Sequence, residues 1–333
     1  MARVAINGLG RVGRLLLRRF CEIDDQEFEI ACINDISSIE NLIYLLSLDS
    51  VHGRFDGSIQ QIDGGIQIDG HSIPVLSESQ ISILPWTDMD IDLVIDCTGL
   101  CKNRENAEKH LQAGAGKVLV SAPVIDADLT IVRGVNDEDY ASQKHHIVSN
   151  ASCTTNSLAP PLKVLMDSFG VESVLATTVH AYTVSQSLVD KPNKKRIQGR
   201  AGAINIIPTS TGSDLATVTV LPKLKDRIRV TALRVPVADG SITDINAILK
   251  TNVNEALVNQ TLKMAAETTM AGIIEYSEED LVSNDIVDNP HSAIIHAKST
   301  RVVRDRHVKI QAWYDNEYGY ACRLLETANQ LSR

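Results

Sequence analysis

Short apolar runs alternate with amphipathic stretches along the first 150 residues of this 333-residue chain. Runs rich in β-branched residues and bounded by turn residues predict strands, whereas apolar residues that recur every three or four positions predict helices. The expected strands are 4–7, 28–34, 93–96, 118–121 and 147–150, and the expected helices are 11–21, 39–46 and 104–113. This alternation predicts an α/β fold, a doubly wound and mostly parallel sheet with helices on both faces. Residues 53–70, with period-two apolar spacing and Asp-Gly turns, predict an inserted hairpin.

The pattern changes after Ser152, where the apolar runs become longer and helical stretches become fewer. These runs predict an antiparallel sheet with helices on one face, and therefore a second domain of the α+β type. Residues 181–203 lack periodicity, which in a compact chain is typical of a functional segment or one covered by a partner. The expected strands are 174–179, 228–237, 242–249, 293–296 and 308–314, and the expected helices include 254–267 and 317–331.

Charge and composition narrow the classes of function. The formal net charge of −10 argues against nucleic acid or anionic lipid as the main partner. No apolar run approaches the length that spans a bilayer, and no charged leader with an apolar core precedes the first strand. The six cysteines have the spacing of neither a secreted disulfide framework nor a zinc site. We therefore expect a cytoplasmic protein without a metal centre and without a membrane partner.

The segment from Gly8 to Gly13 fits the pattern G-x-G-x-x-G directly after the first strand and at the start of a helix. Gly8 would make the tight turn, Gly10 would let a pyrophosphate approach the backbone, and Gly13 would allow close packing of helix on strand. Asp35 ends the second strand 22 residues after Gly13, where a carboxylate can bind ribose hydroxyls and repel a 2′-phosphate. The pattern predicts a site for NAD rather than NADP; the alternative is a glycine-rich turn with a capping aspartate.

Cys153 follows a strand and precedes an apolar helical pattern, so we expect it at a helix N-terminus. The helix dipole there would lower the pKa of the thiol and favour a reactive thiolate. His180 ends the expected strand 174–179 and is the candidate base. The alternatives are a core cysteine among N-cap residues and a structural histidine, and sequence spacing alone does not show that the two side chains meet.

At these residues the chain resembles the glyceraldehyde-3-phosphate dehydrogenase family over essentially its full length. The matching motifs are Asn7-Gly8 with Gly10-Arg11 and Gly13, Ser152-Cys153-Thr154-Thr155-Asn156, His180-Ala181-Tyr182-Thr183, Asn205 to Gly212, Arg234-Val235-Pro236 and Trp313 to Tyr320. The resemblance implies an NAD-binding Rossmann domain over 1–150, completed by the C-terminal helix at 317–333, and a catalytic α+β domain over 151–316. It also implies a homotetramer, in which the 181–203 segment packs against a neighbouring subunit's cofactor site.

The resemblance further implies roles for individual residues. Cys153 is the nucleophile and His180 the base. Thr183 and Arg234 hold the terminal phosphate of the sugar substrate, and Ser152, Thr154, Thr211 and Gly212 hold the attacking inorganic phosphate. Asn316 binds the nicotinamide amide and fixes which ring face receives hydride. The full set of expected cofactor-binding residues is Asn7, Gly8, Gly10, Arg11, Val12, Gly13, Asp35, Thr98, Ser121, Asn316 and Tyr320.

The predicted reaction oxidises glyceraldehyde 3-phosphate with NAD and inorganic phosphate to 1,3-bisphosphoglycerate through a thioester on Cys153. An erythrose-4-phosphate dehydrogenase is the nearest alternative, although Asp35, Thr183 and Thr211 favour the triose substrate. Two further classes are a Cys/His hydrolase, which would not need the dinucleotide motif, and a catalytically silent protein that keeps the fold.

Overall fold

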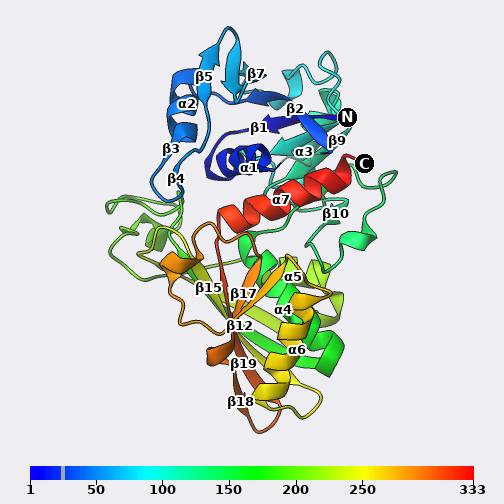
Figure 1. Ribbon diagram of the computed structural model, residues 1–333, viewed down its shortest axis with the longest axis vertical. Coiled ribbons are helices and arrows are strands. Elements are labelled where there is room, and N and C mark those ends of the chain that lie inside the picture. The colour runs from blue at the N-terminus through cyan, green and yellow to red at the C-terminus, as the bar shows by residue number, and fades with distance from the viewer. Residues whose placement is uncertain (24–26) are drawn as a thin grey trace. The chain divides into compact units, whose positions relative to one another are not determined.

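The computed structural model describes residues 1–23 and 27–333, and the chain divides into two compact units (Figure 1). The first comprises Met1–Ile131, Glu138–Ala151 and Ala321–Arg333, and the second comprises Val132–Asp137 and Ser152–Tyr320. The sequence boundaries place Val132–Asp137 in the first domain, whereas the structure groups it with the second. The cause is local packing, because a Cβ built on Gly134 would lie 2.7 Å from Ile273 and 3.0 Å from Met270.

A nine-stranded sheet forms the centre of the first unit, in the order β10-β11-β9-β8-β1-β2-β7-β6-β5. The neighbouring pairs from β10 to β7 are parallel, and only the β5–β6–β7 insertion is antiparallel. The Rossmann-type fold class predicted from the alternating pattern is thereby confirmed. The strands are β1 (Ala2–Asn7), β2 (Phe28–Asn34), β5 (Ile59–Ile62), β6 (Gly65–Ile68), β7 (His71–Leu76), β8 (Leu93–Asp96), β9 (Lys117–Val120), β10 (Leu129–Thr130) and β11 (Ile147–Ser149), and β3 (Leu48–Asp49) pairs with β4 (Gly53–Arg54).

Alternate residues of the central strands enter separate hydrophobic clusters on the two faces of this sheet. Val4 and Ile6 of β1 pack with apolar residues of helices α1 (Arg11–Glu22), α2 (Ile39–Ser47) and α7 (Tyr318–Leu331). On the other face, β9 packs with Ala107 of helix α3 (Arg104–Gln112). Because side chains alternate along a strand, one strand contributes to both layers.

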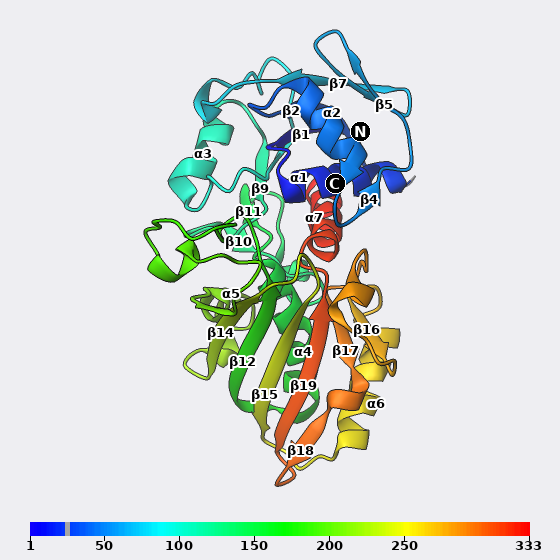
Figure 2. The same ribbon diagram turned by 90° about the vertical axis from the view of Figure 1, so that its left-hand side faces the viewer.

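A mixed eight-stranded sheet forms the second unit (Figure 2). Its order is β13-β14-β12-β15-β19-β17-β16, with β18 paired to β19. The prediction of an antiparallel sheet is wrong for two pairs, since β12 runs parallel to β14 and β16 runs parallel to β17. The strands are β12 (Val171–Ala181), β13 (Ile207–Thr209), β14 (Ile228–Val235), β15 (Ser241–Leu249), β16 (Ile274–Ser277), β17 (Ala293–His296), β18 (Arg301–Val303) and β19 (His307–Tyr314).

Three helices accompany this sheet, namely α4 (Cys153–Phe169), α5 (Ser213–Val220) and α6 (Glu255–Glu267). Helix α4 packs against β15, β17 and β19 and also contacts α5 and α6. The β12–β14 connection is parallel because the chain between them carries α5 and returns to the same end of the sheet, as parallel pairing requires. Among the described residues, no helix combines the length and apolar character that a membrane span requires.

Candidate functional site

A cavity of about 520 Å³ lies at the carboxyl ends of β1, β2 and β8 in the first unit. In parallel α/β sheets this edge is where ligands bind. Five of the predicted cofactor residues line the cavity: Asn7, Gly8, Gly10, Asp35 and Thr98. Sequence reasoning missed most of the remaining wall because its residues belong to no motif; they include Asn34, Glu78, Ser79, Ile81 and Leu100.

The glycine loop has the geometry that a dinucleotide needs. Gly8 adopts a φ of +93°, and a Cβ on Gly13 would lie 2.1 Å from the carbonyl oxygen of Gly8. A Cβ on Gly10 would meet no protein atom within 4 Å, so the side of the chain that Gly10 leaves open faces the cavity it lines. Gly10 is also the N-cap of α1, and no side chain of the described residues caps this helix. An uncapped helix start beside a glycine is a favourable place for a pyrophosphate.

The carboxylate of Asp35 is held at the same edge of the cavity. It accepts hydrogen bonds from the backbone N–H of Leu9 (2.7 Å) and of Ser37 (2.8 Å). The two hydrogen bonds fix the orientation of the carboxylate toward the glycine loop. The loop, the uncapped helix and the fixed carboxylate fit NAD, whose pyrophosphate and ribose hydroxyls would be bound by these groups.

A buried aspartate organises the base of this cavity. The Oδ2 of Asp96 accepts a hydrogen bond from Asn7 Nδ2 (2.8 Å), and its Oδ1 accepts one from Thr98 Oγ1 (2.9 Å). Ser121 lies behind the same strand end, where its N–H donates to the Asp96 carbonyl oxygen (2.9 Å). Asp96 therefore positions three of the residues predicted to bind the cofactor, although no sequence pattern pointed to it.

Asp96, Cys101 and His110 are close enough to one another to suggest a metal site. The hydrogen bonds argue against it. Trp86 Nε1 donates to His110 Nδ1 (3.0 Å), so the ring proton lies on Nε2, which faces Asp96 Oδ2 at 3.2 Å. A protonated nitrogen has no lone pair for a metal, and we assign none here.

Other predicted cofactor residues lie away from the cavity wall. The guanidinium of Arg11 forms an ion pair with Asp49, and Val12 packs against the hydrophobic cluster beneath α1. Asn316 and Tyr320 belong to the second unit. Asn316 lies two residues after the end of β19 and is 6% exposed.

In the second unit the structure brings Cys153 and His180 together. Cys153 is the first residue of α4, and its N-cap Ser152 accepts a hydrogen bond from the Thr155 N–H (3.1 Å). His180 lies near the end of β12 and is 4% exposed. The Cys153 Sγ and His180 Nε2 atoms are 3.4 Å apart, within hydrogen-bonding distance for sulfur. This is the nucleophile–base arrangement that sequence spacing could not demonstrate.

The expected lowering of the thiol pKa is not found. Desolvation by the surrounding protein raises the pKa of Cys153 above its usual value, although the nearby Arg234 charge and hydrogen bonds from Thr154 oppose this effect. Burial lowers the pKa of His180 to about 3, and Arg234 lowers it further in the same direction. Loss of water around the sulfur outweighs the opposing effects of the Arg234 charge and the Thr154 hydrogen bonds. Both shifts favour the uncharged forms, a thiol beside a neutral imidazole.

The other ring nitrogen of His180 faces the backbone. Its Nδ1 lies 2.7 Å from the carbonyl oxygen of Ala181, and Arg234 Nη1 donates to that same oxygen (2.9 Å). Arg234 Nη1 also approaches the Nδ1 atom at 2.5 Å. Donation from Arg234 would need a lone pair on Nδ1, so the Arg234 and Ala181 contacts of Nδ1 belong to different tautomers of His180. In the tautomer whose Nδ1–H donates to Ala181, Nε2 keeps a lone pair directed at Cys153, as a general base requires.

A buried tyrosine that sequence reasoning did not assign completes the wall around this pair. The Tyr314 hydroxyl lies 3.1 Å from Thr154 Oγ1 and 2.7 Å from Thr178 Oγ1, and its ring meets His180 edge-on with centroids 5.9 Å apart. The hydroxyl of Thr154, a predicted phosphate ligand, is therefore hydrogen-bonded to the Tyr314 hydroxyl. The only signal in the sequence was the position of Tyr314 within the 313–320 motif.

The remaining predicted phosphate ligands occupy loops and helix starts. Thr183 follows β12, and its hydroxyl contacts Ser185 Oγ (3.0 Å) and Gln186 Oε1 (3.2 Å). Thr211 and Gly212 precede α5, whose N-cap is Gly212 without a side-chain cap among the described residues. Helix α5 packs against α4, which begins at Cys153.

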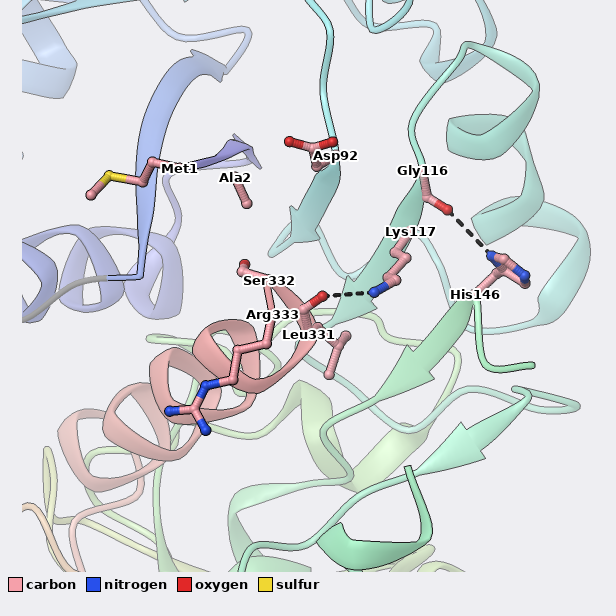
Figure 3. Close-up of a pocket in the computed structure, with 9 residues that line it drawn as sticks. All are labelled: Met1, Ala2, Asp92, Gly116, Lys117, His146, Leu331, Ser332 and Arg333. Carbon is pink, nitrogen blue, oxygen red and sulfur yellow. Dashed lines mark hydrogen bonds between the residues drawn. The ribbon is translucent and has the colours of Figure 1, made fainter. Parts of the chain in front are cut away.

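A further cavity of about 440 Å³ lies in the first unit at the amino ends of β8 and β9 (Figure 3). Its polar side chains are bonded within the protein: Lys117 Nζ donates to the Leu331 carbonyl oxygen (2.8 Å), and Arg333 pairs with Glu27. Asp92 Oδ2 accepts from the Arg3 N–H (2.8 Å). We assign no ligand to this cavity.

Comparisons with known proteins agree with this geometry. Residues 2–104 match the model described as the NAD binding domain of glyceraldehyde 3-phosphate dehydrogenase, and residues 152–316 match the C-terminal domain of the same family. The chain is 45% identical over 324 residues to glyceraldehyde-3-phosphate dehydrogenase 2 of Bacillus subtilis, which covers 97% of this chain and 95% of that protein. It is 45% identical over 331 residues to the Thermotoga maritima enzyme of that name, covering 99% of each. It is 43% identical over 326 residues to the Geobacillus stearothermophilus enzyme, covering 98% of this chain and 97% of that protein.

Proposed function

Because the chain belongs to the glyceraldehyde-3-phosphate dehydrogenase family, we propose that it oxidises and phosphorylates glyceraldehyde 3-phosphate to 1,3-bisphosphoglycerate. The observation that carries this proposal is the 3.4 Å contact between Cys153 Sγ and His180 Nε2, with Arg234 beside both. A nucleophile, a base and a cation for an anionic substrate are the groups that this reaction needs.

The first step uses the neutral pair. Cys153 sulfur attacks the aldehyde carbon while His180 Nε2 accepts the thiol proton and returns it to the carbonyl oxygen, which gives a hemithioacetal. His180 then accepts the proton of the new hydroxyl as the carbon is oxidised. Bound NAD supplies the hydride acceptor for that oxidation.

The second step releases the product from Cys153. A phosphate oxygen attacks the thioester carbonyl, the carbon–sulfur bond breaks, and the departing sulfur takes back the proton held by His180. The acyl phosphate leaves, and the pair returns to a neutral thiol and a neutral imidazole. The lowered pKa of His180 favours the return of this proton. Its surroundings stabilise the imidazolium poorly, so the protonated ring gives up its proton readily.

We assign the two phosphate groups to separate residues. Arg234 and Thr183 would bind the phosphate of the sugar, because a guanidinium offers a bidentate fork and a threonine adds a neutral donor. The attacking phosphate would lie at the start of α5, near Thr211 and Gly212, with Ser152 and Thr154 from α4. The N-terminus of α5 supports this assignment, since a helix N-terminus favours anions and its N-cap Gly212 has no side chain. Thr211 Oγ1 accepts from the first N–H of this helix, that of Ser213 (3.1 Å).

An assay of NADH formation tests the function. With triose phosphate, NAD and inorganic phosphate, we expect steady NADH production. In a buffer that contains neither phosphate nor its analogue arsenate, we expect turnover to fall sharply, because nothing attacks the thioester on Cys153. Erythrose 4-phosphate serves as the competing substrate. A higher kcat/KM for erythrose 4-phosphate than for the triose would contradict the substrate assignment, and phosphate-independent turnover would contradict the phosphorylating step.

We also propose a homotetramer in the cytoplasm. Residues 182–206 expose apolar side chains to a degree unusual for a monomer: Val184 is 94%, Leu188 81% and Ile204 80% exposed. A reducing compartment would keep the Cys153 thiol available, and the six cysteines, all within the described residues, are free. Sedimentation equilibrium of the wild type and of a Leu188→Asp variant tests the assembly, and a monomeric wild type would contradict it.

A further inference from the structure

We infer that Ser241 is a positioning residue that fixes the orientation of the Asn316 amide toward the nicotinamide ring. The inference rests on the proposed function, since it assumes that Asn316 binds the carboxamide of NAD. Ser241 is the first residue of β15 and is fully buried. In the sheet Ser241 lies opposite Tyr314, and Tyr314 precedes Asn316 by two residues.

Two hydrogen bonds define the role of the Ser241 hydroxyl. Its oxygen accepts from the backbone N–H of Ala181 (3.1 Å), and its hydrogen is donated to Asn316 Oδ1 at 2.5 Å. Because the Ser241 hydroxyl is the donor in this contact, its partner is the amide oxygen of Asn316. The Nδ2 group is thereby turned away from Ser241 and can donate to a ligand.

The same hydroxyl connects Asn316 to the strand that carries the base. The carbonyl oxygen of Ala181 lies 2.7 Å from His180 Nδ1, and the N–H of Ala181 is the donor to Ser241. Ser241 therefore joins the end of β12 to Asn316, two residues after the end of β19. A nicotinamide amide held by Asn316 would be placed in register with His180 through this one hydroxyl.

Burial makes the orientation strict. Asn316 is 6% exposed and Ala181 is fully buried, so water does not readily replace the Ser241 hydroxyl. Without it, the Ala181 N–H and Asn316 Oδ1 would both lose a partner in a desolvated setting. The Asn316 side chain could then rotate by half a turn and present its oxygen, which cannot donate, to the ligand.

Equilibrium binding separates this role from a merely structural one. Ser241→Ala should weaken NADH binding about tenfold, since one oriented hydrogen bond is lost, whereas ADP-ribose, which lacks the nicotinamide ring, should bind as it does to the wild type. The rate of Cys153 alkylation should also stay close to wild type. Ser277→Ala is the matched control, because Ser277 is a buried serine of the same sheet whose hydroxyl accepts from the Glu279 N–H (3.1 Å).

A mutant cycle identifies the path of the effect. In an Asn316→Ala background, Ser241→Ala should cause no further loss of NADH affinity, because the group it orients is absent. Ser241→Thr, which keeps the hydroxyl, should restore selectivity for NADH over ADP-ribose. Should Ser241→Ala not fold, Ser241→Cys, with its weak S–H donor, takes its place in the same comparison.

Two results would overturn the inference: unchanged NADH affinity in Ser241→Ala, or parallel loss of NADH binding, ADP-ribose binding and Cys153 alkylation. These outcomes are distinct from failure of the proposed function. If the wild type gives no NADH from triose phosphate yet Ser241→Ala loses NADH selectivity, the function fails and the role of Ser241 stands. If the wild type forms NADH from triose phosphate and Ser241→Ala binds NADH normally, the proposed function stands and the role of Ser241 fails.

Discussion

The two candidate sites of this protein are made from different parts of the polypeptide. The dinucleotide cavity is shaped mainly by backbone, with Gly8, Gly10 and Gly13 in one short loop and Asp35 held by two N–H groups. The proposed catalytic pair is formed by side chains that lie far apart in sequence, with Cys153 on α4 and His180 on β12. A backbone site therefore depends on where side chains are absent, whereas a side-chain site depends on which ones are present.

The substitution with the largest expected effect on the side-chain site is Cys153→Ser. A hydroxyl beside a neutral imidazole is a much weaker nucleophile than a thiol, so NADH formation should fall at least about 1000-fold. NAD affinity should be retained, because the dinucleotide cavity lies in the other unit. Cys21→Ser, at a partly exposed position of α1, is the control and should keep most of the activity. Undiminished NADH formation by Cys153→Ser would end the covalent mechanism.

The backbone site is best tested by two glycine substitutions with opposite expected results. Gly13→Ala places a methyl group 2.1 Å from the Gly8 carbonyl oxygen and should destabilise the fold by about 1–3 kcal/mol. Gly10→Ala meets no protein atom within 4 Å, so its free energy of unfolding should change by less than about 1 kcal/mol, while NAD binding should weaken. Urea unfolding and NAD titration measure the two effects. Equal destabilisation by both substitutions would contradict this account.

Acid sensitivity sharpens the comparison for the side-chain site. Burial lowers the pKa of His180 to about 3 from an ordinary value of 6.5, so between these pH values the unfolded chain binds a proton that the folded protein does not. Stability should therefore fall as pH falls, by about 2 kcal/mol from this group between pH 6.5 and 5.

His180→Asn removes this proton uptake and should flatten the loss of stability below pH 6.5, as followed by urea unfolding at several pH values. His71→Asn, at an exposed position of β7, is the control and should leave the pH dependence unchanged. If His180→Asn retains the wild-type pH slope, the buried neutral imidazole is not the source of it.

The smallest expected effect concerns Asp35, the side chain expected to select the cofactor in the dinucleotide cavity. Asp35→Gly removes the carboxylate that would bind the ribose hydroxyls and repel a 2′-phosphate, so the ratio of kcat/KM for NADP to that for NAD should rise about tenfold or more. Asp35→Glu keeps the charge and should preserve the preference for NAD. An unchanged ratio in Asp35→Gly would show that the carboxylate does not select the cofactor.

Local signals in the sequence predicted much of the fold. The expected strands at 28–34, 93–96 and 293–296 coincide with β2, β8 and β17. Each is a largely apolar run next to turn residues, so its bounds can be read from neighbouring positions in the sequence. Strand direction in the second sheet was not predictable in this way. Whether β12 pairs parallel to β14 depends on the path of more than forty intervening residues, and apolar periodicity carries no information about that path.

The candidate sites differ in the same respect. The glycine loop could be predicted because its requirements act within six residues, and the position of Cys153 at a helix start follows from its neighbours. The direction of the thiol pKa could not, because desolvation depends on what the whole domain places around the sulfur. Tyr314 and Ser241 were missed for a related reason, since a hydroxyl at a strand end gives no sign in sequence of what it will contact.

The Ala181 peptide group, with its N–H on Ser241 and its carbonyl oxygen at His180 and Arg234, has a consequence for how this catalytic domain can diverge. Every residue except proline supplies the same backbone N–H and carbonyl oxygen, so other substitutions at position 181 keep both contacts and change only the side-chain volume. Under the role that we infer for Ser241, substitutions that misalign the cofactor with His180 should therefore concentrate at position 241 rather than at position 181.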